Sequence, residues 1–402
     1  MTQRDRFPRK DNLSDRVDLQ HSDAKQQHFL LLDGLRGVAA VAVATSHACI
    51  VFGGTQLLPK ATLAVDFFFL LSGIVVAHAY ERKLKQGQIR EYFERRLIRL
   101  YPMILVGALL GMSVVITSPA TRGLPASTLT YLGLTAALCL PIFRANVYPV
   151  SHSIAPVNLP SWSLFFEIFV NAVYGLVAKH LTSPRLVAIS LTAFVVEAIG
   201  VFKFNGVNFG VYVENFEWGF ARVFFPFFAG VLINRVFTPR PLPAFAMAPL
   251  MLAIALVATF YVPTSGVWNA VSEMIAVAII YPCVILIAMR VTVSSGQGHV
   301  LAWLGAVSYP VYAIHVPLFL WLARLQRVSA SRFQVSPYCW IVVSVVFSIV
   351  CAWIILKIYD LPLREKLATR MKRRSRASGA CAGWRGVIPK GGATHRYQLA
   401  KV

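Results

Sequence analysis

Arg36 and His47 lie in the first long apolar run of the chain, residues 29–52, and both are of types that do chemistry. Arg36 and His47 are eleven residues apart. On a helix this spacing gives about 1100° of rotation and a rise of about 16 Å, so the side chains face nearly the same way at different depths. A neutral imidazole can act as a general base, and a guanidinium group pairs with carboxylates or phosphates. Because ionisable groups are costly in an apolar span, both are candidates for function.

Three other apolar runs each carry an ionisable residue, namely Asp66, Glu167 and His315. With the N-terminus in the cytoplasm, their positions along the runs place all three at about the depth of His47. This convergence predicts one buried polar site in the outer half of the membrane. Asp66 or Glu167 is expected to orient His47 and hold its tautomer, so His47, Asp66 and Glu167 are the candidate catalytic residues.

The same residues also admit structural interpretations. A transmembrane histidine often forms a hydrogen bond between helices, and His315, which follows Tyr309 and Tyr312, is expected either to do so or to contact an acceptor. Glu167 could instead pair with Arg222. Asp33, three residues before Arg36, is the expected ion-pair partner of that arginine.

A basic segment, residues 94–102, places Arg96 and Arg99 three residues apart on one helix face. Arginine forks suit phosphate recognition, although a cytoplasmic arginine also serves as an ordinary topology anchor. A nucleotide-headed donor with a long arm would connect this segment with the first apolar run. Its phosphates would bind Arg96 and Arg99, and its arm would pass Arg36 to reach His47. Acyl-coenzyme A has this shape.

The elements that must position these residues are membrane helices. The chain is 57% hydrophobic and 14% charged, whereas soluble globular proteins carry about 25% charged residues. A soluble fold is therefore excluded, and runs of sufficient length to span a bilayer predict an all-α polytopic membrane protein with about ten transmembrane helices. The runs are 29–52, 62–80, 99–118, 161–180, 185–203, 220–237, 244–263, 268–290, 300–323 and 338–358. A further run, 127–143, is shorter and is expected to be re-entrant or interfacial.

Charge distribution predicts that both termini lie in the cytoplasm. With ten crossings, most Lys and Arg residues fall inside, whereas Glu214 and Glu217 fall outside; only the loop after residue 323, with Arg324 and Arg327, disagrees. We expect a charged cytoplasmic segment 1–28, a membrane domain 29–367 and a basic, disordered tail 368–402. The net charge is +22, and the tail is expected to touch anionic membrane lipid rather than nucleic acid. The six cysteines form no C-x-x-C pair, so no metal site is expected.

Six stretches, in a fixed order, carry a family resemblance. They are LDGLRG at 32–37 leading to His47, VDFFFLLSG at 65–73, RRLIRLYP at 95–102, SWSLFFE at 161–167, SYPVYAIH at 308–315 and DLPLR at 360–364. Together they resemble the acyltransferase-3 family of membrane O-acyltransferases, which modify bacterial envelope and exported glycans. The resemblance covers about residues 29–367.

The resemblance implies an Arg-x10-His element at Arg36 and His47, with His47 as the catalytic base. It also implies a donor-binding Arg-x-x-Arg element at Arg96 and Arg99. Ser72, Trp162 and Ser163, with Asp33, Arg222, Tyr309, Tyr312 and His315, are expected to be acceptor-site or structural polar residues. The sequence departs from the family in having only Glu167 where paired acids are usual, and in having no hydrolase-like domain after the last helix.

The residues and the resemblance together predict a membrane O-acyltransferase of the bacterial inner membrane. It would move an acyl group, acetyl by default, from cytoplasmic acyl-coenzyme A to a hydroxyl of a glycan or lipid-linked saccharide. No permanently bound cofactor is expected. The alternative is a transporter or flippase for a glycan or small metabolite, which would use the same polar layer without chemistry.

Overall fold

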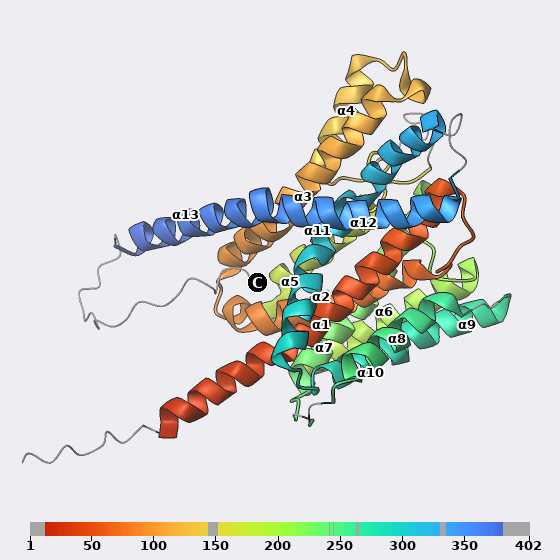
Figure 1. The fold of residues 1–402 in the computed structure, drawn as a ribbon. Helices are drawn as coiled ribbons and strands as arrows, with labels where there is room; N and C mark the ends of the chain where they lie inside the picture. The colour runs from red at the N-terminus through yellow and green to blue at the C-terminus, as the bar shows by residue number, and fades with distance from the viewer. Residues whose placement is uncertain are drawn as a thin grey trace, which may run out of the picture.

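The computed structural model describes residues 13–143, 152–240, 242–243, 245–262, 265–329 and 335–380. Within these ranges the secondary structure is helical, and no strand is formed. Figure 1 shows a bundle of tilted helices crossed by the long continuous helix of α12 and α13. The helices are α1 (Leu13–Phe52), α2 (Ala64–Lys85), α3 (Ile89–Thr117), α4 (Ala126–Ala137), α5 (Ser161–Val177), α6 (Ser183–Phe204), α7 (Trp218–Val236), α8 (Ala248–Tyr261), α9 (Val267–Ile275), α10 (Tyr281–Ala288), α11 (Ser295–Ser329), α12 (Pro337–Ile355) and α13 (Leu361–Ala380).

Nine helical segments in the described part of the chain are long and apolar enough to cross a membrane. The tenth expected span, 244–263, contains only the 14-residue helix α8, which rises about 21 Å against a hydrocarbon core of about 30 Å. The run 127–143 forms the 12-residue helix α4, which is too short to cross. The all-α polytopic membrane fold is thus confirmed, with one expected span shortened.

Helices α1 and α11 run parallel at close range because glycines line their contact. A Cβ on Gly37 would lie 2.7 Å from the Leu304 carbonyl oxygen, and one on Gly305 would lie 2.5 Å from Cβ of Asp33. Small residues allow helix backbones in a membrane to approach in this way. The pairing keeps one register along both helices, so Arg36 and His47 both face α11.

Helix α5 begins inside the bundle rather than at its outer surface. Asn158, just before α5, donates a hydrogen bond to the Ala313 carbonyl of α11 and lies against Gly107 of α3. From Gly107 to the C-terminal end of α3 at Thr117 is about 15 Å. Because α5 then runs antiparallel to α3, its residues lie nearer the basic end of α3 than the sequence predicts.

Candidate active site

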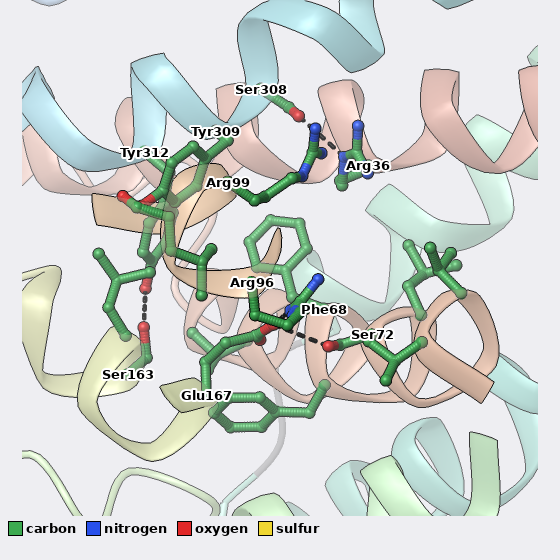
Figure 2. A pocket seen from close by; sticks show the side chains of 17 residues that line it. Arg36, Phe68, Ser72, Arg96, Arg99, Ser163, Glu167, Ser308, Tyr309 and Tyr312 are labelled. Atoms are coloured by element: carbon green, nitrogen blue, oxygen red, sulfur yellow. Dashed lines mark hydrogen bonds and ion pairs between the residues drawn. The ribbon is translucent and has the colours of Figure 1, made fainter. Parts of the chain in front are cut away.

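A pocket of about 120 Å³ lies between α1, α2, α3, α5 and α11 (Figure 2). Three arginines, Arg36, Arg96 and Arg99, are among its lining residues. The other polar groups of the lining are Ser72, Ser163, Glu167, Ser308, Tyr309 and Tyr312, and the remaining wall is apolar. The structure therefore brings the predicted arginine of the first helix together with both predicted arginines of the basic segment.

Arg36 is held by three groups. Its Nη2 forms an ion pair with Asp33 at 2.9 Å, as the spacing of three residues predicts. Its Nε donates to Ser308 Oγ at 3.0 Å, and Nη2 donates to the Gly305 carbonyl at 2.8 Å. These contacts fix the guanidinium group at the pocket edge facing α11.

Arg96 pairs with Glu167, which corrects the expected place of that carboxylate. Arg96 Nη2 lies 2.9 Å from Glu167 Oε1, and Ser72 Oγ donates to the same oxygen at 2.7 Å (Figure 2). Glu167 is thus at the level of the arginines, because α5 starts inside the bundle, and not beside His47. The alternative pairing of Glu167 with Arg222 is also wrong.

Arg99 differs from the other two arginines. Among the residues whose side chains the structure describes, it has neither a hydrogen bond nor an ion pair, and its guanidinium group points toward Arg36 and Ser308 (Figure 2). Arg36 and Arg96 each have one carboxylate partner. The pocket therefore has one uncompensated positive charge, and an unpaired charge in a partly buried place favours an anionic ligand.

His47 and His315 form a direct hydrogen bond between α1 and α11. His47 Nδ1 lies 2.8 Å from His315 Nε2, and the rings are nearly parallel at 13°. His315 is fully buried and His47 is half-buried. The sequence predicted that both lie at one depth, and the structure shows that they touch.

The other nitrogen of His315 determines the tautomers of the pair. His315 Nδ1 lies 2.9 Å from the Val311 carbonyl and 3.0 Å from the Tyr312 carbonyl. A carbonyl only accepts, so His315 Nδ1 carries a hydrogen, and in a neutral ring Nε2 is then an acceptor. His47 Nδ1 must donate to it. The lone pair of His47 therefore lies on Nε2, the nitrogen directed away from His315.

Tyr312 stands between the arginine pocket and the histidine pair. Its ring lines the pocket and its centroid lies 6.0 Å from that of His315. Its hydroxyl lies 2.6 Å from Ser163 Oγ, and its ring meets Phe68 edge-on at 5.6 Å. Ser308, Tyr312 and His315 are spaced by four and three residues, so one face of α11 runs from the arginines to the imidazoles.

Comparison with known proteins identifies the family to which the chain belongs. The family model described as an acyltransferase domain matches residues 29–357, which include the pocket and both histidines. The chain belongs to the acyltransferase-3 family. A relative from Rhizobium radiobacter, protein 2 in the picA locus, is 34% identical over 197 residues, which are 46% of this chain and 100% of that protein. No solved structure matches the chain.

In this acyltransferase, Asp66 does not orient His47, which corrects the expectation from the sequence. Arg222 donates to both Asp66 oxygens, Nε to Oδ1 at 2.9 Å and Nη2 to Oδ2 at 2.9 Å, and both side chains are fully buried. Trp162 lies over the guanidinium group at 5.1 Å. Asp66, Arg222 and Trp162 thus connect α2, α7 and α5, outside the arginine pocket.

Several buried polar residues of the acyltransferase were not singled out from the sequence. Asn158 sits where α3, α5 and α11 meet, and its Oδ1 is buried without a hydrogen bond. Both carboxylate oxygens of Glu197 are also buried without a hydrogen bond to any residue that the structure describes. Asp360 and Arg364, in the stretch DLPLR at 360–364, form a further ion pair that the sequence did not predict. Glu197 could have been found as an ionisable residue inside the apolar run 185–203, and Asn158 as a polar residue two positions before Pro160.

Proposed function

We propose that this acyltransferase moves an acyl group, acetyl by default, from cytoplasmic acyl-coenzyme A to a hydroxyl of an envelope or exported glycan, with His47 as the general base. The observation that carries the proposal is the hydrogen-bond chain from the Val311 carbonyl through His315 to His47. It leaves the Nε2 lone pair of His47 free to take a proton. Membership of an acyltransferase family favours this over the transporter alternative.

The donor would enter from the arginine side. Its phosphates suit the guanidinium groups of Arg96 and Arg99, and Arg99 has no partner among the described residues that a phosphate would have to displace. A pocket of about 120 Å³ accommodates only part of an acyl-coenzyme A. We infer that the pantetheine arm extends through the pocket past Arg36 and Tyr312, with the thioester near His47.

The proposed transfer needs no reactant besides the acyl thioester and the acceptor hydroxyl. His47 Nε2 takes the proton of the acceptor hydroxyl while the oxygen attacks the thioester carbonyl, forming the new C–O bond. The tetrahedral intermediate expels the thiolate as the C–S bond breaks, and the imidazolium returns the proton to that sulfur. In the covalent variant His47 would itself be acylated first. In both, His315 is a positioning residue that holds the reactive tautomer.

The test is replacement of His47 in the purified full-length protein. We expect His47→Ala to reduce release of coenzyme A in the presence of a candidate glycan by at least about 10²-fold, the usual contribution of general-base catalysis, with binding of coenzyme A retained. His299→Ala is the matched control, because His299 is exposed and bonds only to its own helix at Ser295. Full activity of His47→Ala would remove His47 from the mechanism.

A further inference from the structure

The C-terminal end of the membrane region brings a fourth arginine, Arg364, into the neighbourhood of Arg99. Between α12 and α13 the helix passes through a π-helical turn, Leu356–Asp360, and such turns change the direction of the following side chains. Asp360, the last residue of the turn, is fully buried, and Arg364 one turn later is 16% exposed. Helix α13 contacts α3, which carries Arg96 and Arg99.

Asp360 and Arg364 are close but poorly satisfied. Arg364 Nη2 lies 2.5 Å from Asp360 Oδ2. Nevertheless, neither Asp360 oxygen has a well-aligned hydrogen bond, and Arg364 Nε is buried without a partner among the described residues. Buried charged groups with open hydrogen-bonding positions cost free energy unless another group satisfies them. This pair is therefore not a completed structural ion pair of the kind that Asp66 and Arg222 form.

Asp360 and Arg364 lie within electrostatic range of Arg99, and their helix packs on the helix that carries it. The positive charges of Arg36, Arg96 and Arg364 all act on the Arg99 guanidinium group. Arg99 in turn acts on Asp360, and Arg364, Asp360 and Arg99 all act on Tyr309, which lines the pocket. Arg96 Nε and Arg364 Nε, which have no hydrogen-bond partner among the described residues, thus belong to side chains within electrostatic range of Arg99.

The charge balance of this neighbourhood points to an anion. Asp33 partners Arg36, Glu167 partners Arg96 and Asp360 partners Arg364. Arg99 remains, with like charges around it. A multiply charged group with several acceptor oxygens would satisfy the open nitrogens and reduce the repulsion, and arginine forks match phosphate geometry.

We propose that Arg364 of α13 and Arg99 of α3 form a binding site for a phosphate or pyrophosphate group. Asp360 holds Arg364 in place when the site is empty, and the phosphate replaces this carboxylate as its partner. The inference rests on the proposed function in taking the ligand to be the phosphate end of the acyl donor. The proposed site adds helix α13 to the donor-binding residues. The donor would then contact the C-terminal helix as well as the first three membrane helices.

Equilibrium binding to the purified full-length protein in lipid nanodiscs tests the site. The probes are coenzyme A, pantetheine, which lacks the phosphates, and inorganic pyrophosphate. We expect Arg364→Gln to weaken binding of coenzyme A and of pyrophosphate about tenfold or more, the effect of losing a charge-assisted hydrogen bond. Binding of pantetheine should not change. Arg370→Gln, which removes the same charge from an exposed position on the same helix, is the matched control and should stay within about twofold.

Asp360→Asn separates ligand binding from a purely structural role. If Asp360 competes with the phosphate, this variant binds coenzyme A as tightly as the wild type or more tightly. If Arg364 serves only to pair with Asp360, both single variants weaken coenzyme A and pantetheine alike, and the inference is overturned. Should Arg364→Gln fail to fold, the double variant Asp360→Asn, Arg364→Gln removes both charges together and gives the same comparison.

The outcomes distinguish this inference from the proposed function. Turnover of acyl-coenzyme A with binding that is independent of Arg364 would refute the phosphate site and leave the function standing. Arg364-dependent binding of pyrophosphate without any turnover of acyl-coenzyme A would support the site and count against the function.

Discussion

At the scale of single residues, the imidazole pair shows how a backbone carbonyl can determine the chemistry of a side chain on another helix. Val311 accepts from His315 Nδ1, and His315 Nε2 therefore accepts from His47. In serine hydrolases a carboxylate orients the histidine in the same way. Here Asp66, the carboxylate that the sequence suggested for this role, accepts hydrogen bonds from Arg222 instead. A second histidine, His315, orients His47 in its stead.

Replacement of His315 should therefore change catalysis more than binding. We expect His315→Ala to lower kcat about 10²-fold or more, because His47 loses the acceptor that holds its tautomer, with KM for acyl-coenzyme A nearly unchanged. His315→Gln should recover part of the loss, because its amide oxygen can accept from His47 Nδ1. Steady-state kinetics of both variants provide the measurement. Equal losses in the two variants, or a rise in KM alone, would contradict the positioning role.

At the scale of helices, the site depends on contacts that only glycine allows. Gly73 of α2 and Gly230 of α7 face each other's backbones, and a Cβ on Gly73 would lie 2.0 Å from the Phe227 carbonyl oxygen. Helix α2 carries Ser72 and Phe68 into the pocket. The close α2–α7 contact therefore sets the position of one pocket wall.

Gly73→Ala should destabilise the protein by about 1–3 kcal/mol, the usual cost of overpacking a well-packed contact. The clash is with backbone and cannot be relieved by a change of rotamer. Thermal unfolding of the purified protein in detergent measures the effect. Gly296→Ala is the control, since a Cβ there meets nothing within 4 Å, and it should be neutral or slightly stabilising. An unchanged unfolding temperature for Gly73→Ala would show that α2 and α7 can separate without cost.

At the scale of the whole molecule, the two ends of α3 differ in charge, and this difference predicts the orientation in the membrane. The turn before α3 lies between the basic end of α2 and the basic start of α3. Positive charge next to a span favours the cytoplasm. We therefore predict that the opposite end of α3, followed by residues 118–125, is external, and that the arginine pocket lies on the cytoplasmic side of His47, as the proposed donor requires.

Thiol labelling of whole cells tests this orientation. In a variant without native cysteines, Gly123→Cys should react with a membrane-impermeant maleimide added outside, because position 123 is exposed in the external loop. Gly87→Cys, equally exposed before α3, should react only after the cells are permeabilised. The reverse pattern would place the arginine pocket on the outer face and exclude a cytoplasmic donor.

The sequence by itself determined the properties that depend on a single helix, such as which side chains share a face. Composition predicts an all-helical membrane protein, and helical spacing alone predicts that Asp33 pairs with Arg36 and that Arg36 and His47 share a face. Spacing also predicts that Arg96 and Arg99 face one way, and the structure places both on the pocket. These are local properties of rise and rotation along a continuous chain.

Only the tertiary structure decided which polar groups meet across helices. The sequence placed Glu167 beside His47 on the assumption that α5 starts at the membrane surface, but packing of Asn158 against Gly107 starts it inside the bundle. Glu167 therefore meets Arg96, Asp66 meets Arg222, and His315 is left for His47. The relative depth of two helices depends on the glycine contacts and loops between them, and no periodicity within either helix contains that information.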